Sequence, residues 1–303
     1  MKFKFRDKIK YIYNGHIINW LWRNKNKRRD IRNRAYSEMV LSYLSKYIPY
    51  IQSLYMESEG EEKNDKVEKI FSVWLQGEEQ APEIVKKCIE SVRSKNMDTY
   101  TLLTEADIFN YVKLPDHIIS KWRQKIIGPA HFVDIVRIEL LYQYGGYWMD
   151  ATNFMTGDIP KEIKDSDFFM FLATDEYFHI FIQNYFIRAK KRHPILRLWR
   201  DVLYEYWKNE NEAADYFFAQ YLFKLLVTHN TEAKTHFDEM IKRNSDTSQL
   251  LWTRLGDKPF DPSMYEEMKE KSFFQKCSYK KRKNYIYEIL PESMADYVIN
   301  GKI

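Results

Sequence analysis

A pair of glycines, a short apolar run and an aspartate form the segment that most constrains the fold of this chain. Gly145 and Gly146 predict a turn, and residues 147–149 are large and apolar, as in a short buried strand. Asp150 ends this strand, and a carboxylate is costly to bury unless a cation or several hydrogen-bond donors meet it. Because ligands of open α/β sheets bind beyond the carboxyl ends of strands, Asp150 is the first candidate for holding a ligand or a metal.

Segments typical of strands and of helices alternate along the chain. The predicted buried strands are 69–75, 99–103, 147–150 and 168–172. The predicted helices are 35–56, 83–95, a short one capped by Thr104 and Asp107, 115–126, 130–143, 194–208 and 213–228. The alternation is typical of an α/β layered sheet, and the chain after about residue 245 is expected to be irregular.

The composition is that of a folded protein with a basic N-terminus. At 303 residues, 45% of them hydrophobic, the chain can bury a core and is not disordered. Residues 1–34 carry a net charge of +10, against +5 for the whole chain, so the remainder is acidic. This basic stretch could be a solvated helical arm, or contact an anionic membrane surface or nucleic acid. The acidic remainder argues against nucleic acid as the main partner.

The cysteines and the hydropathy pattern bear on the location of the protein. Cys88 and Cys277 form no CxxC pattern, which predicts no disulfide framework and no zinc cluster and suits a reducing compartment. No apolar run reaches about 18 residues, so we expect no transmembrane helix. The basic N-terminus lacks the apolar core of a secretory signal, and a cytoplasmic location is therefore expected.

The predicted helix 130–143 is apolar on most sides and is expected to be buried. Asp134 and Arg137 lie three positions apart on one face of it. They could pair with each other. Alternatively they contact a ligand, because arginine can bind a phosphate or carboxylate with two N–H groups and aspartate can accept from an N–H or hydroxyl group. The residues alone leave both possibilities open.

The order of these features is more specific than any one of them. A buried helix with an aspartate and an arginine precedes two glycines and the strand that ends in Asp150, and residues 73–77 read Val-Trp-Leu-Gln-Gly upstream. In this order the chain strongly resembles the bacterial capsular polysaccharide synthesis proteins, which are glycosyltransferases related to α-mannosyl and α-galactosyl transferases. The resemblance covers about residues 69–300. It implies an α/β glycosyltransferase-A fold, a Rossmann-like mixed sheet flanked by helices, over 67–303, after a basic helical extension at 1–66.

The resemblance also implies how a nucleotide-sugar donor is bound. The first strand and its loop hold the base and ribose, and the buried helix lies against the nucleotide and sugar. The glycines let the backbone approach the ligand closely. Asp150 belongs to a DxD element that holds a divalent cation, Mn²⁺ or Mg²⁺, on the diphosphate. The implied donor-binding residues are Trp74, Gln76, Gly77, Asp134, Arg137, Gly145, Gly146 and Thr152.

Two departures from the family pattern weaken the predicted metal site. The DxD-like element ends in Thr152, so its second carboxylate is missing, and Gln275 stands where relatives often carry a histidine. One carboxylate with neutral oxygens is a weak site for a divalent cation. Lys276 or Lys280 could neutralise the diphosphate instead, as in metal-independent members of the broader fold.

Two further residues are candidates for catalytic contact beside Asp150. Asp215 and Asn184 match positions that relatives also carry. For Asp215 the alternative is a carboxylate that complements a helix dipole, and for Asn184 it is a packing role.

The predicted function is transfer of a hexose-type sugar from a nucleotide-sugar donor, with a UDP-sugar favoured, to a glycan acceptor in capsular or surface polysaccharide synthesis. Related families retain the anomeric configuration, so we expect an α-linkage. The acceptor is expected to be a lipid-linked glycan at the inner face of the bacterial membrane, which the basic N-terminus contacts peripherally, and no nucleic acid is expected as a partner. The alternative is a non-catalytic nucleotide-sugar or glycan binding protein that kept the fold.

Overall fold

The strands of the described residues form two sheets. The structure is a computed structural model that describes residues 25–55, 68–173, 180–279 and 289–302. Its strands are β1 (Ile70–Val73), β2 (Tyr100–Leu103), β3 (Gly146–Met149), β4 (Asn153–Met155), β5 (Phe168–Leu172), β6 (Ile182–Ala189) and β7 (Phe274–Lys276). Five of them form one sheet in the order β2-β1-β3-β6-β5, and β4 pairs with β7 in a second sheet.

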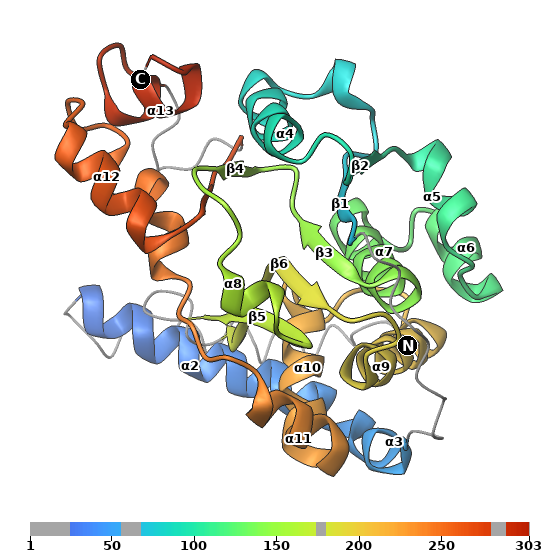
Figure 1. Cartoon of the computed structure of the whole chain (residues 1–303). Coiled ribbons are helices and arrows are strands. Elements are labelled where there is room, and N and C mark those ends of the chain that lie inside the picture. The colour runs from blue at the N-terminus through green and yellow to red at the C-terminus, as the bar shows by residue number, and fades with distance from the viewer. Residues whose placement is uncertain (1–24, 56–67, 174–179, 280–288, 303) are drawn as a thin grey trace.

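Helices surround these sheets on both sides (Figure 1). The α-helices preceding β3 are α2 (Lys25–Leu44), α3 (Ile48–Ser53), α4 (Glu83–Lys95), α5 (Glu105–Tyr111), α6 (Asp116–Arg123) and α7 (Pro129–Tyr144). Those following β3 are α8 (Lys161–Lys164), α9 (Pro194–Asn209), α10 (Phe218–His229), α11 (Thr231–Glu239), α12 (Pro262–Lys271) and α13 (Met294–Asn300). Short 3₁₀ turns, η1 (Ser45–Tyr47), η2 (Glu78–Gln80) and η4 (Asp246–Gln249), and a π-helix, η5 (Leu251–Leu255), complete the described elements.

The strand β3 is the centre of the larger sheet. It runs parallel to β1, which is also parallel to β2, whereas β6 runs antiparallel to β3 and to β5. The loops after β1 and β3 therefore leave the sheet at the same edge, where α/β folds bind their ligands. Asp150 follows β3 at this edge, with β1 on one side of β3 and β6 on the other.

Alternate residues of the central strands face two separate hydrophobic cores. Phe71 and Trp148 face the larger core, to which α7, α9 and α10 contribute. Ile70 and Met149, one position away in each strand, face a second core with β7 and α8. Because both faces of the sheet are covered, the short strands are mostly apolar on both faces, as in buried sheets generally.

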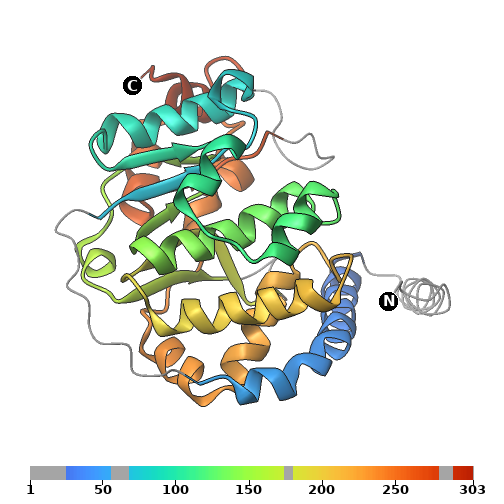
Figure 2. The same cartoon turned by 90° about the vertical axis from the view of Figure 1, so that its right-hand side faces the viewer.

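The N-terminal helices α2 and α3 pack into the larger core, where both contact α10. Figures 1 and 2 place these blue helices at the end of the molecule away from α4 and α13. The predicted single helix 35–56 is wrong, since α2 and α3 are separated by η1. Pro49, in the first turn of α3, has no N–H to donate to the preceding turn, so the α-helical hydrogen bonding is interrupted there. None of the helices in the described ranges has the length and apolar character needed to cross a membrane.

The α/β class and several predicted elements are confirmed. The helix at 83–95 and the strand at 168–172 have their predicted bounds, and the helices at 130–143 and 194–208 are α7 and α9. The predicted cap is also present, because the carboxylate of Asp107 accepts a hydrogen bond from the backbone N–H of Thr104 at 3.0 Å.

Three further predictions of secondary structure are wrong. The chain after residue 245 is not irregular, since it forms η4, η5, α12, β7 and α13. The predicted helix 213–228 begins only at Phe218, as α10. The strand β6 is missing from the prediction, although all eight of its residues are buried. Gln183, Asn184 and Arg188 interrupt its apolar pattern, so periodicity alone conceals it.

Close contacts with other backbone segments require the two glycines at the start of β3. Gly145 and Gly146 have φ angles of +68° and +89°, which disfavour any residue with a Cβ. A Cβ on Gly146 would lie 2.3 Å from the carbonyl oxygen of Lys69, and one on Gly145 would lie 2.6 Å from the backbone nitrogen of Lys191. Gly145 directly precedes β3 and Gly146 is its first residue, so both lie at the end of the strand opposite Asp150. The close approach that they allow is thus to the protein's own backbone, not to a ligand as the resemblance implied.

We predict that Gly146→Ala lowers the free energy of unfolding by at least about 3 kcal/mol, because positive φ and a backbone clash act together. Gly301→Ala is the matched control, since Gly301 also has positive φ (+67°) but a Cβ added there would meet no atom within 4 Å. That variant should lose only about 1 to 2 kcal/mol. Urea unfolding followed by circular dichroism measures both, and equal losses would show that the contact with Lys69 is not the cause.

Candidate functional site

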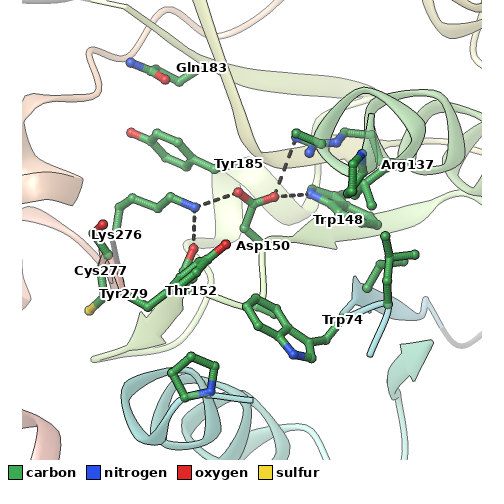
Figure 3. A pocket seen from close by; sticks show the side chains of 18 of the residues that line it. Trp74, Arg137, Trp148, Asp150, Thr152, Gln183, Tyr185, Lys276, Cys277 and Tyr279 are labelled. Carbon is green, nitrogen blue, oxygen red and sulfur yellow. Dashed lines mark hydrogen bonds and ion pairs between the residues drawn. The ribbon is translucent and has the colours of Figure 1, made fainter. Parts of the chain in front are cut away.

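A cavity of about 820 Å³ opens beyond the carboxyl ends of β1 and β3. Its walls come from the loop after β1, from α7, from β6, from the η4–η5 segment and from residues 276–279. This volume lies within the range of pockets that bind small ligands. Figure 3 shows Asp150 in the middle of the cavity, with Arg137 and Lys276 directed at its carboxylate from different sides.

The carboxylate of Asp150 is held by one lysine, one arginine and one indole. Oδ2 accepts a hydrogen bond from Lys276 Nζ at 2.6 Å, and Oδ1 accepts one from Trp148 Nε1 at 2.8 Å. Arg137 Nη1 lies 3.6 Å from Oδ1. The backbone N–H of Asp150 donates to the carbonyl of Tyr185 on β6 at 2.9 Å, which fixes the residue at the end of the sheet.

These cations control the ionisation of Asp150. Burial by itself would raise the pKa of this carboxyl group, but the charges of Lys276 and Arg137 outweigh it and hold the pKa below the usual value. Asp134 shows the opposite balance, because burial raises its pKa even though the neighbouring Arg137 lowers it. Asp150 is therefore a charged partner of two cations, which makes it a weak general base.

Lys276 reaches Asp150 because the small sheet brings β7 beside β4. In this antiparallel pair Lys276 stands opposite Asn153, and the backbone N–H of Cys277 donates to the carbonyl of Thr152 at 2.8 Å. The ammonium group of Lys276 then donates to Thr152 Oγ1 at 2.6 Å, the same distance as to Asp150. The two ends of the DxD-like element are thus bridged by a lysine.

A buried hydrogen-bond network holds Arg137 in place. Arg137 Nη2 pairs with Asp134 Oδ1 at 3.1 Å, and Nη1 donates to the backbone carbonyl of Asn184 at 2.6 Å. The side-chain amide of Asn184 donates to the same Asp134 oxygen at 3.0 Å and accepts from Gln220 at 3.2 Å. The first alternative from the sequence is confirmed, because Asp134 and Arg137 pair on the helix. Arg137 also lines the cavity, and its contact with a ligand stays a prediction. Asp134 and Asn184 do not line it and orient the arginine instead.

The residues beside Asp150 do not fit a divalent cation. Asp150 and Thr152 would supply one carboxylate and one hydroxyl, and the ammonium of Lys276 already lies between them. Within the described ranges no group of three His, Cys, Asp or Glu side chains could hold a metal ion. Gln275 supplies no ligand either, because its side chain is fully buried and bonds the backbone of Leu251 and Thr247. By themselves these side chains supply fewer oxygen ligands than a hard divalent cation takes, and a cation between Asp150 and Thr152 would have to displace the ammonium of Lys276.

The remaining predicted residues are divided between the cavity and its surroundings. Trp74 and Gln76 line the cavity, whereas Gly77 lies beside it with a φ of +84°. Asp215 does not line it. Its carboxylate accepts from the backbone N–H of Phe217 at 2.7 Å and from the hydroxyl of Tyr36 at 2.6 Å, so it acts at the start of α10, as the alternative interpretation expected. Lys280 lies outside the described residues.

Several cavity residues escape the sequence prediction. Tyr279 packs edge-on against Trp74, with ring centroids 5.3 Å apart, and both rings line the cavity near α4. Gln183 of β6 lies on the opposite side of Asp150 from Trp74 (Figure 3), and Tyr185 of β6 and Trp252 of the π-helix also line the cavity. A π-helix is rare and often occurs at functional sites, but its hydrogen-bond pattern cannot be read from sequence. Tyr279, which follows β7, could have been predicted from the sequence, because it lies three positions after the candidate residue Lys276.

Comparison with known families gives one match. The family described as capsular polysaccharide synthesis protein matches residues 19–298 of the chain. The match begins well before residue 69, where the sequence resemblance was expected to start, and so includes α2 and α3. A search of curated proteins and a search of solved structures each gave no match.

We predict that Asp150→Asn removes a pH-dependent contribution to stability. Because the folded state lowers the pKa of Asp150, its ion pairs stabilise the fold above the unfolded-state pKa of about 3.9 and this contribution disappears as the pH falls through the folded-state value. The free energy of unfolding of the variant should be lower by roughly 1 to 3 kcal/mol at pH 7, and the difference should shrink below about pH 4.

Urea unfolding at a series of pH values measures this difference. Asp158→Asn, at an exposed position, is the matched control and should unfold like the wild type at every pH. A difference between Asp150→Asn and wild type that does not change with pH would contradict the assignment.

Proposed function

Because the chain belongs to the capsular polysaccharide synthesis protein family, we propose that it is a glycosyltransferase that moves a sugar from a nucleotide-sugar donor to a glycan acceptor. The observation that carries this proposal is the convergence of Lys276 and Arg137 on Asp150 inside a cavity at the carboxyl edge of the sheet. Two fixed cations at a ligand-binding edge suit a diphosphate, whose negative charge grows as it leaves. The mixed sheet with helices on both faces is consistent with a glycosyltransferase-A fold.

In this proposal Lys276 and Arg137 replace a metal ion as partners of the diphosphate. An ammonium group has three N–H donors, and Asp150 and Thr152 use two of those of Lys276. The remaining donor can meet a phosphate oxygen without breaking either contact. Asp150 keeps the lysine and the arginine close together before the donor arrives, so little reorganisation is needed on binding.

The reaction needs no side chain as general base. Asp150 is the only carboxylate, and no histidine is present, among the described residues that line the cavity. We propose that the acceptor hydroxyl attacks the anomeric carbon from the face that the diphosphate leaves. The bond from this carbon to the phosphate oxygen breaks, the bond to the acceptor oxygen forms, and the hydroxyl proton passes to the leaving phosphate oxygen. This reaction retains the α configuration at the anomeric carbon.

The aromatic end of the cavity suits the nucleotide base. Trp74 and Tyr279 offer ring surface there, and the buried indole N–H of Trp74 has no hydrogen-bond partner in the described part of the chain. Such a donor is costly to leave unpaired, and a base or ribose oxygen could accept from it. We favour a UDP-sugar as the donor and a lipid-linked glycan as the acceptor. The basic stretch proposed to contact the membrane lies mainly outside the described residues.

Turnover of a nucleotide sugar tests the proposed function directly. Purified full-length protein, incubated with lipid-linked or soluble glycan acceptors and a panel of UDP- and GDP-sugars, should release the nucleoside diphosphate. Asp150→Ala should abolish this release while circular dichroism shows an intact fold. Tight binding of a nucleotide sugar, with no release of nucleoside diphosphate in the presence of any acceptor, would instead favour the alternative of a non-catalytic binding protein.

We predict that Lys276→Met lowers kcat/KM by roughly 10²- to 10³-fold, because one fixed donor to the departing diphosphate is lost. Methionine keeps the approximate length of the side chain and removes its charge. Lys271→Met is the matched control, since Lys271 lies exposed on α12 and pairs locally with Glu267. In the same assay EDTA should leave wild-type activity within about twofold of its initial value. Loss of activity in EDTA and recovery with Mn²⁺ would contradict the replacement of a metal by lysine.

A further inference from the structure

Gln183 is a buried glutamine whose side chain has no partner in the described part of the protein. Only 7% of its surface is exposed, and it lines the cavity from β6. No hydrogen bond joins its amide to any described residue, whereas the amide of its neighbour Asn184 bonds both Asp134 and Gln220. The amide atoms of Gln183 are not among the fully buried unpaired polar atoms of the described residues, so they are open to the cavity that the side chain lines. A recessed amide that bonds no protein group but faces a cavity is placed to bond a ligand.

The sheet order places this amide on a definite side of the charged centre. Trp74 follows β1, Asp150 follows β3 and Gln183 lies on β6, and these three strands are neighbours in the order β1-β3-β6. Adjacent strands are about 4.8 Å apart, so β1 and β6 are separated by roughly 10 Å. Figure 3 shows the same order, with Trp74 and Gln183 on opposite sides of Asp150. A ligand with its diphosphate at Asp150 and its base at Trp74 would direct its sugar toward Gln183.

The groups nearest to Gln183 suit hydroxyls. Tyr185, two positions along β6, and Gln249 are neutral cavity residues whose side chains contact each other at 3.4 Å. The ammonium of Lys276 lies 5.4 Å from the centroid of the Tyr185 ring, but it donates to Asp150 and Thr152. Burial raises the pKa of Tyr185 to about 12, so its phenol stays protonated. An amide can donate to one hydroxyl and accept from another. Because Gln183 is so little exposed, it suits a single sugar unit tied to the diphosphate better than a large acceptor that enters from solvent.

We propose that Gln183 is a specificity-determining residue that recognises a hydroxyl group of the transferred sugar. This inference rests on the proposed function, and it identifies the sugar as the part of the donor that β6 contacts. A site that pairs a buried polar group with a substrate hydroxyl discriminates strongly against a substrate that lacks this hydroxyl.

The test compares wild type with Gln183→Leu, which keeps the approximate size of the side chain and removes its hydrogen bonds. Calorimetry measures the affinity for UDP and for UDP-glucose, UDP-galactose and UDP-N-acetylglucosamine, and turnover is measured with the best of these donors and its single-deoxy analogues. We expect the variant to bind UDP within about twofold of wild type and to lose roughly 10- to 100-fold in kcat/KM for the best donor. Wild type should reject one deoxy analogue by at least about tenfold, and the variant should not.

Two results would overturn the inference. The first is a variant that keeps the wild-type discrimination among all donors and analogues. The second is equal loss of affinity for UDP and UDP-sugars together with a lowered melting temperature, which would indicate a packing role. Gln124→Leu, at a surface position after α6, controls for the substitution itself. If the wild type binds the nucleotide sugars without turnover, the proposed function fails. The role of Gln183 is then decided by calorimetry alone, because Gln183→Leu should lose the affinity that UDP-sugars have in excess of UDP.

Discussion

The ion pair between Lys276 and Asp150 is the contact on which the arrangement of the cavity depends. It joins the end of β3 to β7, which lie far apart in the chain, at a distance of 2.6 Å. A carboxylate at the end of a buried strand requires compensation for its lost hydration, and two cations and an indole provide it here. The same contact places the ammonium group where a ligand of opposite charge can reach it. In the proposed function, Lys276 thus combines structural compensation with ligand recognition.

The second cation is fixed by a different part of the fold. Arg137 projects from the buried helix α7 and is oriented by Asp134 and by the backbone of Asn184 on β6. The helix packs on the same face of the sheet as α9 and α10, so the arginine has little freedom to move. Both cations are therefore positioned before a ligand binds. Positioned charges in a sheltered cavity stabilise a developing anion more strongly than mobile charges in water do.

Local sequence patterns predicted the parts of the fold that depend on neighbouring residues. The amphipathic helix at 83–95, the cap at Thr104 and the apolar strand at 168–172 each follow from a pattern within one element. The prediction failed where distant contacts decide the outcome. The strand β6 carries polar residues such as Asn184, whose partners lie on α7 and α10, so its pattern looks unlike a buried strand. The C-terminal elements are short and gain their order from packing against α4 and each other.

The sequence by itself determined the α/β class, the strand that ends in Asp150 and the buried helix that carries Asp134 and Arg137. These features depend on periodicity and on the conformational preferences of individual residues. Only the tertiary structure decided which charge faces Asp150, because a lysine 126 positions away comes beside it through the pairing of β4 with β7. The tertiary structure also decided that the two glycines allow close contact with other backbone segments of the protein, and that Gln183 faces the cavity. Such assignments require distances between residues remote in the chain, which no local pattern contains.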